Sequence, residues 1–205
     1  MLTLKACAPA TIITGSWKSP TNTSASKSYE NILVAVLNNH TVEKAALEND
    51  LVGELGRYSI KVTKSIDLFP PEVSNSDSDR VAIINKVHSK DIDAILMVSL
   101  LSKQTDSRYV QRRYPYNPGR YTYYNDFWGY YSYRYPYAYS PGYYTEKSYY
   151  METNLYDAKT EKLIWSAQTE TYDVDNLTAF SKDYSKAIVN KLAEDGILKP
   201  VPQNP

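Results

Sequence analysis

The chain has 205 residues, and its 23 lysines and arginines balance 23 aspartates and glutamates. This length accommodates one domain with appended segments, and the neutral charge argues against a nucleic acid as partner of the whole chain. The single cysteine, Cys7, excludes an internal disulfide and any cysteine-based metal site, and no apolar run reaches the length of a membrane-spanning helix.

The first 29 residues are expected to form a tether ahead of the domain. Residues 8–29 are rich in Ser, Thr, Pro and Lys, a composition that buries too little apolar surface to fold alone. The order Leu4-Lys5-Ala6-Cys7 resembles the end of a bacterial lipoprotein signal, although Lys5 departs from that pattern. Cys7 is therefore the predicted lipidation site, and a free thiol on a frayed terminus is the alternative.

The next part of the chain predicts a β-α-β-α-β unit. Asn31–Leu37 and Ala94–Leu101 are continuously apolar, as in strands that are covered on both faces. A helix is expected over Thr41–Leu55, a shorter strand over Ile60–Thr63 and a second helix over Asp79–Ser89. Strands separated by helices in this way pair in parallel through right-handed crossovers.

The carboxyl-terminal part predicts an antiparallel hairpin followed by a helix. Apolar and polar residues alternate over Ser148–Tyr156 and again over Leu163–Gln168, so one face of the hairpin is expected to be more exposed than the other. Trp165 is expected on the buried face. The last helix, Asn176–Asp195, carries one apolar stripe, and residues 200–205 are expected to be a frayed tail.

The predicted fold class is therefore α/β (α+β), with a single mixed five-stranded sheet and helices packed on it. The order along the chain is β-α-β-α-β-(insertion)-β-β-α. The expected strand order in the sheet is 2-1-3-4-5, with strand four antiparallel. The domain is predicted to span residues 30–199 and to be interrupted by an insertion over residues 105–147.

The insertion is exceptionally rich in tyrosine. Sixteen of the 21 tyrosines lie between Tyr109 and Tyr150, and every second residue from Tyr131 to Tyr139 is tyrosine. An extended backbone would place those rings on one side, and tyrosine offers a large amphipathic contact area that suits sugars and protein surfaces. The predicted partner-binding residues are Tyr123, Trp128, Tyr131, Tyr133, Arg134, Tyr135, Tyr137 and Tyr139.

A solvated low-complexity loop is the alternative interpretation of the same composition. Because the strands on either side of the insertion have complete patterns of their own, the insertion is expected to be removable without loss of the fold.

The sequence shows no set of residues typical of catalysis or of cofactor binding. The two histidines, His40 and His88, have no partner at the spacing of a metal site. Phosphate-binding glycine loops, dinucleotide fingerprints and nucleophile elbows are absent from the sequence. We therefore expect no enzyme activity, no cofactor and no metal.

Several landmarks together resemble a family of bacterial envelope lipoproteins. They are Ser16–Pro20, Leu68–Pro71, Asp93–Leu96, Glu152–Asp157 and Lys162–Ser166, arranged around the tyrosine-rich insertion. The α/β domain of this family is similar to the amino-terminal domain of TolB and to the curli-secretion lipoprotein. The resemblance implies a secreted, lipid-anchored domain and carries over no catalytic residue.

The expected function is that of a non-enzymatic lipoprotein of the bacterial cell envelope, on the periplasmic side and anchored to the outer membrane through Cys7. The insertion is expected to bind an envelope protein or a glycan such as peptidoglycan, and no nucleic acid. The alternative is a subunit of an outer-membrane assembly or secretion channel, with the insertion as a membrane hairpin. Against it, the insertion lacks the apolar outer face of a barrel strand. The oligomeric state is left open.

Overall fold

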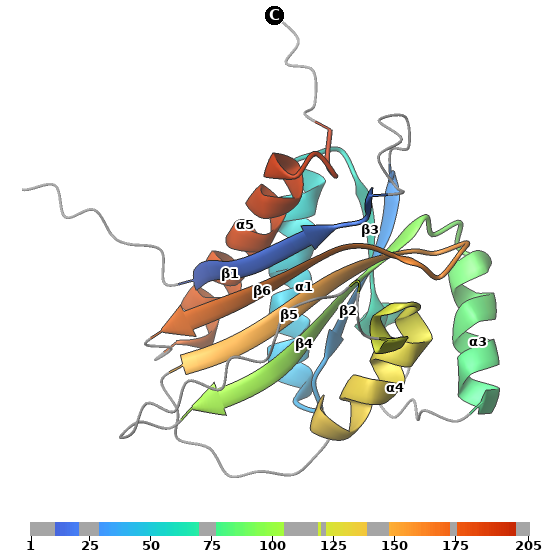
Figure 1. Cartoon of the computed structure of the whole chain (residues 1–205), viewed down its shortest axis with the longest axis horizontal. Helices are drawn as coiled ribbons and strands as arrows, with labels where there is room; N and C mark the ends of the chain where they lie inside the picture. Colours follow the sequence, from blue (N-terminus) through green and yellow to red (C-terminus); the bar gives the residue numbers. More distant parts are fainter. Residues whose placement is uncertain are drawn as a thin grey trace, which may run out of the picture.

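A computed structural model of the chain has a six-stranded mixed sheet at its centre (Figure 1). The structure describes residues 11–20, 29–69, 77–104, 119, 122–138, 148–172 and 176–199. The strands are β1 (Thr11–Lys18), β2 (Asn31–Leu37), β3 (Lys61–Lys64), β4 (Ala94–Gln104), β5 (Ser148–Asp157) and β6 (Leu163–Tyr172). The helices are α1 (Thr41–Gly56), α2 (Ser65–Leu68), α3 (Asp77–His88), α4 (Phe127–Ala138) and α5 (Leu177–Glu194), with a short 3-10 helix, η2 (Thr122–Tyr124).

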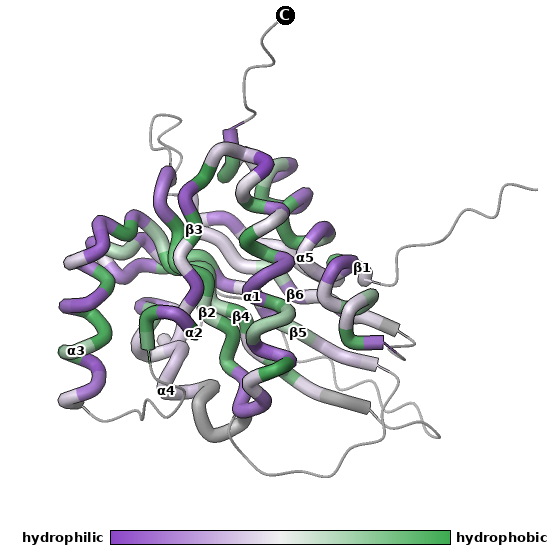
Figure 2. The backbone as a smooth tube through the Cα atoms, turned by 180° about the vertical axis from the view of Figure 1, so that it is seen from behind, coloured by the Kyte–Doolittle hydropathy of each residue, from purple (hydrophilic) through white to green (hydrophobic). Residues whose placement is uncertain are grey.

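The strand order is β1-β6-β5-β4-β2-β3. β2 pairs in parallel with both β3 and β4, and β5 is antiparallel to β4 and β6, as the sequence predicted for these strands. The expected count of five strands is wrong, and the order differs from the expected one because β1 adds a sixth strand beside β6. In Figure 2 the central strands β2 and β4 are the most hydrophobic part of the sheet. Helices cover both faces there.

The sixth strand lies within the segment that the sequence assigned to a tether. β1 pairs antiparallel with β6, from Thr11 opposite Thr171 to Lys18 opposite Trp165. The sequence pattern did not reveal β1, because residues 8–29 as a whole are rich in Ser, Thr, Pro and Lys. A strand at the edge of a sheet gains its order from backbone pairing and covers the unpaired edge of its neighbour. Residues 11–18 are therefore part of the sheet. Cys7 and residues 200–205 lie outside the described residues.

Two apolar clusters fill the spaces on either side of the sheet. α1 and α5 cover one face, where Leu51 and Ile188 pack with Trp165. α3 and α4 cover the other face, where Val87 and Tyr130 belong to a second cluster. Among the described residues, no helix is long and apolar enough to cross a membrane.

The tyrosine-rich insertion is helical in its described part. Over Phe127–Ala138, the expected extended stripe of alternating tyrosines is wrong, because residues two apart on a helix point in nearly opposite directions. Within α4, Phe127, Trp128 and Tyr131 instead follow the i, i+1, i+4 spacing of one helical side and are buried, as are Tyr130 and, in the preceding η2, Tyr124. Asp126 helps to begin the helix by accepting a hydrogen bond from the backbone NH of Gly129, at 2.7 Å.

The insertion is also tied to the turn between β5 and β6. The backbone NH of Phe127 donates to the carbonyl of Glu161 at 3.1 Å, and Asp126 forms an isolated bridge with Lys162. The face of the hairpin that was expected to be more exposed is buried here, because η2 and α4 cover Glu152, Asn154 and Tyr156. The insertion thus supplies part of the core.

Candidate functional site

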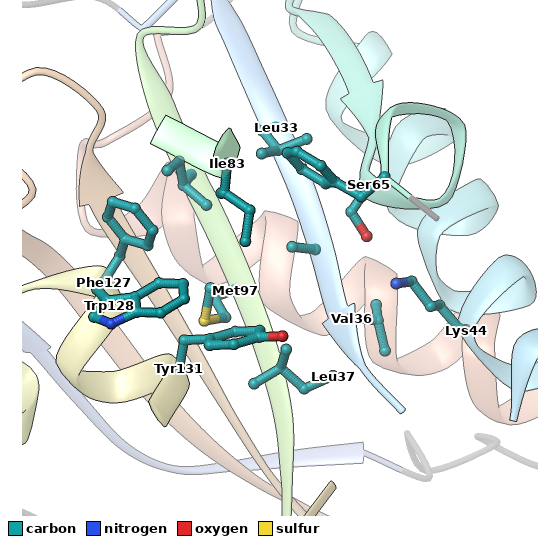
Figure 3. A pocket seen from close by; sticks show the side chains of 13 residues that line it. Leu33, Val36, Leu37, Lys44, Ser65, Ile83, Met97, Phe127, Trp128 and Tyr131 are labelled. Carbon is teal, nitrogen blue, oxygen red and sulfur yellow. The ribbon is translucent and has the colours of Figure 1, made fainter. Parts of the chain in front are cut away.

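A pocket opens on the α3 and α4 side of the sheet, beside the carboxyl-terminal end of β2 (Figure 3). Its lining residues are Leu33, Ala35, Val36, Leu37, Lys44, Ser65, Phe69, Ile83, Ile95, Met97, Phe127, Trp128 and Tyr131. The space open to the centres of water molecules is about 60 Å³. In open α/β sheets, ligands bind outside the carboxyl ends of the parallel strands, where the connections diverge to opposite faces. We name this cavity the α4 pocket.

The α4 pocket exists because the edge strand β3 is short. β3 pairs with β2 only as far as Val34, so the last residues of β2 have no strand on that side. In place of a neighbouring strand, the fully buried carboxylate of Glu48 accepts a backbone hydrogen bond from this end of β2. It accepts hydrogen bonds from the backbone NH of Val36 at 3.1 Å, the hydroxyl of Ser65 at 2.6 Å and the backbone NH of Ile66 at 3.0 Å. Glu48 therefore joins α1, β2 and α2 at the rim of the pocket.

The opposite wall of the pocket is aromatic and comes from the insertion. The rings of Trp128 and Tyr131 stack with their centres 5.2 Å apart and their planes 20° apart. The guanidinium of Arg80 lies 5.9 Å from the centre of the Trp128 ring, and Arg80 also pairs with Glu161 at 3.5 Å. A cation above an indole ring is attracted by its electron-rich face. The wall is thereby fixed to α3 and to the β5–β6 turn.

Among the residues that the structure describes, one cationic side chain, Lys44, lines the α4 pocket. Figure 3 shows it on one side of the cavity with its nitrogen directed inward, and Phe127 and Trp128 on the other side. Burial lowers the pKa of Lys44, although the negative charge of Glu48 opposes the shift. The Lys44 ammonium forms no hydrogen bond or ion pair with any residue that the structure describes. Its charge is therefore poorly compensated.

The structure separates the residues that the sequence proposed for partner binding. Trp128 and Tyr131 line the α4 pocket. Tyr123 and Tyr133 stack on each other outside it, with ring centres 4.0 Å apart, and Tyr133 is 40% exposed. Arg134, Tyr135 and Tyr137 belong to α4, but their side chains lie outside the described part of the structure, as does the whole of Tyr139.

A buried polar network lies beneath η2 and α4. Glu152 accepts hydrogen bonds from the Tyr124 hydroxyl and, at 2.9 Å, from the side-chain amide of Gln168. The hydroxyls of Tyr130 and Ser99 are 2.5 Å apart. Burial, reinforced by the charge of Glu152, raises the pKa of Tyr124 far above its usual range. A phenol kept protonated in this way is a hydrogen-bond donor rather than a nucleophile, so the network holds the aromatic segment on the sheet.

A second pocket lies on the other face of the sheet, near the same end of β2. Its lining includes Glu43, Tyr149, Met151 and Phe180, and the space open to water centres is about 130 Å³. The carboxylate of Glu43 accepts a hydrogen bond from the side chain of Asn38 at 2.7 Å. The described part of its lining contains an acid and no base, so the described linings of the two pockets have opposite charge character.

The described residues contain no group of three or more His, Cys, Asp or Glu side chains placed to hold a metal ion. The ring of His88 contacts a backbone carbonyl, that of Ala158, at 3.4 Å, and His40 lies at the start of α1.

Comparisons with known proteins do not assign the chain to a family. No protein-family model and no curated protein sequence matches it. Among solved structures, it is similar to a PelC dodecamer from Paraburkholderia phytofirmans, with a TM-score of 0.47 and 8% identity over 89% of this chain and 96% of that chain. It is also similar to lipoprotein GNA1162 from Neisseria meningitidis, with a TM-score of 0.39 and 17% identity over 80% of this chain and 98% of that chain. Similarities this remote assign no function to the chain.

Proposed function

We propose that the protein is a non-enzymatic binding protein of the bacterial cell envelope, and that the α4 pocket holds an apolar group of its partner. The observation that carries the proposal is the composition of this pocket: aliphatic side chains of β2 and β4 form its floor, and Trp128 and Tyr131 form its wall. Ligand pockets are typically concave and mostly apolar, with a few polar groups that fix orientation.

An aromatic pair outside the pocket, the exposed Tyr133 and the partly buried Tyr123, supports a larger recognition surface. Tyr123 and Tyr133 stack outside the cavity, and their rings offer a flat face to a sugar ring or to a partner side chain. Under this proposal an envelope protein or a glycan contacts the aromatic pair, and the α4 pocket receives the apolar part of a bound molecule. Lipidation of Cys7 would hold this site near the membrane.

Two alternatives have less support. An enzyme would need a nucleophile with a base or a metal-ligand set, and neither histidine in the described residues is hydrogen-bonded to a hydroxyl group. A channel subunit with the insertion as a membrane hairpin would need strands in the insertion. Over Phe127–Ala138 the chain is instead a helix packed on the sheet.

The proposal can be tested by NMR of methyl-labelled methionine, because Met97 and Met151 report on different places. Met97 lines the α4 pocket and Met151 lines the second pocket. Addition of octanol as a simple apolar probe is expected to shift the Met97 methyl resonance saturably and to leave Met151 unchanged. Trp128→Ala should weaken this binding about tenfold, the effect of losing about 1.4 kcal/mol of contact.

The matched control for this test is Val81→Ala on α3, which removes an exposed apolar side chain outside the pocket and should leave binding unchanged. The same variants are then compared in the capture of envelope proteins and glycans. A Met97 resonance that does not respond to octanol, or Met97 and Met151 responding together, would contradict the proposed site.

A further inference from the structure

The placement of Lys44 runs against two preferences that govern charged side chains. It lies near the amino-terminal end of α1, where the helix dipole disfavours a positive charge. It is also partly buried, and burial of an ammonium group without a partner costs free energy. A side chain that is unfavourable on both counts and points into a cavity gains most from an anion inside that cavity.

Glu48 does not supply that anion. Its two carboxylate oxygens already accept three hydrogen bonds, from β2 and α2, and neither lies within ion-pair distance of the Lys44 ammonium. Its charge acts on Lys44 only from farther away. The other nearby cation, Arg80, lies against Trp128 and pairs with Glu161. Of the charged groups that line the pocket, Lys44 alone is left to bind a ligand.

We propose that the α4 pocket binds a small anionic amphiphile, a single-chain aliphatic carboxylate whose head pairs with Lys44 and whose chain lies between Met97, Trp128 and Tyr131. The charge and the apolar walls lie on opposite sides of the cavity, as the two ends of such a ligand require. The inference rests on the proposed function of the α4 pocket and adds the chemistry of its ligand.

The hydrogen bonding of the rim favours this ligand over the carboxyl terminus of a peptide. A peptide would bring backbone NH and carbonyl groups that need partners in the cavity. The backbone NH of Val36 and the hydroxyl hydrogen of Ser65 already donate to Glu48, so neither remains to donate a hydrogen bond to a peptide carbonyl. An alkyl chain makes no such demand, and the floor and far wall of the cavity are apolar.

The test compares three probes of equal chain length: octanoate, octanol and octylamine. Binding is followed by the methyl resonance of Met97, and the methyl resonance of Met151 reports separately on any binding to the second pocket. In the wild-type protein octanoate should bind about tenfold more tightly than octanol, the factor given by one charge-assisted hydrogen bond, and octylamine should bind most weakly. Lys44→Met, which keeps the apolar stem and removes the charge, should bring octanoate to the affinity of octanol or below.

The matched control is Lys61→Met, which removes the same charge from an exposed position on β3 and should keep the preference for octanoate. Equal affinity of wild-type protein for octanoate and octanol would overturn the inference and leave the apolar pocket standing. Loss of the preference in both lysine variants would also overturn it, because net charge would then be the cause.

Binding of a peptide through its free terminal carboxylate, without binding of octanoate, would overturn the inference and assign the pocket to a protein partner. Failure of all three probes would refute the pocket function as well.

Discussion

The environment of Trp165 shows how single residues hold the two layers together. The side chain is fully buried, as predicted from the alternation along the hairpin, and shares the core on the α1 and α5 side with Phe180 and Tyr184. Its indole NH donates to a carboxylate oxygen of Asp195 at 2.7 Å, and the other oxygen pairs with Lys191 at 2.8 Å. β6 is therefore connected to the end of α5 by packing and by a charge-assisted hydrogen bond.

Replacing Trp165 tests this connection. Trp165→Ala is expected to lower the free energy of unfolding by about 3–5 kcal/mol, because it leaves a large cavity in the core. Trp165→Phe keeps much of the packing and loses the hydrogen bond, so its cost should be smaller. Urea unfolding of the two variants measures both costs. A loss below about 1 kcal/mol for Trp165→Ala would mean that the residue faces solvent.

The buried phenol of Tyr29, two residues before β2, makes the stability of the protein depend on pH in the alkaline range. Burial, helped by the charges of Asp157 and Asp93, raises its pKa from 10 to about 12. Because the folded state favours the neutral phenol, this stabilising contribution is complete below pH 10 and is lost as the pH rises through about 12. Tyr29→Phe should therefore lose less stability than the wild-type protein over this interval, as measured by urea unfolding at a series of pH values. Tyr133→Phe, at an exposed ring, is the control, and a Tyr29→Phe curve that parallels the wild type would contradict the assignment.

At the scale of elements, the tyrosine-rich insertion departs most from the sequence-based expectation. The sequence predicted a module that could be removed without harm to the fold. Its described part instead places five aromatic side chains in the core on the α3 and α4 side: Tyr124, Phe127, Trp128, Tyr130 and Tyr131. They cover the polar face of β5, so their removal would expose Glu152 and its neighbours.

Replacing Tyr109–Glu146 with a short turn is therefore expected to destabilise the domain by more than about 5 kcal/mol, a loss comparable with the whole stability of many domains. Circular dichroism during thermal unfolding measures the effect. The matched control shortens the chain only within residues 105–118 and keeps every described aromatic side chain. Loop entropy predicts a change below about 1 kcal/mol for that control. If the full replacement melts like the wild type, the aromatic cluster is dispensable and the insertion is separable after all.

The elements predicted from sequence are those with a strong period. β2 and β4 are continuously apolar, and α5 carries one apolar stripe, so local pattern and tertiary burial agree. β1 was missed because half of its residues are polar, it lies in a segment rich in Ser, Thr, Pro and Lys, and its order comes from pairing with β6. α4 was missed because the period of two over Tyr131–Tyr139 masked the helical spacing of the aromatic residues before it. The proposed role of Lys44 in binding a ligand depends on the pocket that the short length of β3 leaves open, and no local sequence pattern reveals that length.

At the scale of the whole molecule, the strand directions place the proposed anchor and the α4 pocket toward the same end of the sheet. The first residue of β1, Thr11, pairs with Thr171 near the end of β6. The next residue of β6, Tyr172, pairs with Ser148 at the start of β5. Ser148 in turn pairs with Gln104 at the carboxyl end of β4. Since β2 is parallel to β4, its carboxyl end beside the pocket points the same way. Only three residues lie between Cys7 and Thr11, so the chain from one to the other spans at most about 14 Å. An acyl chain on Cys7 would therefore hold this end of the sheet near the membrane surface.

Two measurements test this orientation in the lipidated protein. Cys7→Ser in the full precursor is expected to release the protein into the soluble periplasmic fraction, because each buried methylene of the anchor contributes about 0.8 kcal/mol. With Cys7 acylated, a fluorophore can be attached at Ser148→Cys, at the anchored end, or at Ser89→Cys, in the turn after α3 and before β4. Energy transfer to an acceptor lipid should be stronger from residue 148 than from residue 89. Equal transfer from the two positions would show that the pocket end does not face the membrane, and membrane association of Cys7→Ser without lipid on the chain would remove the anchor itself.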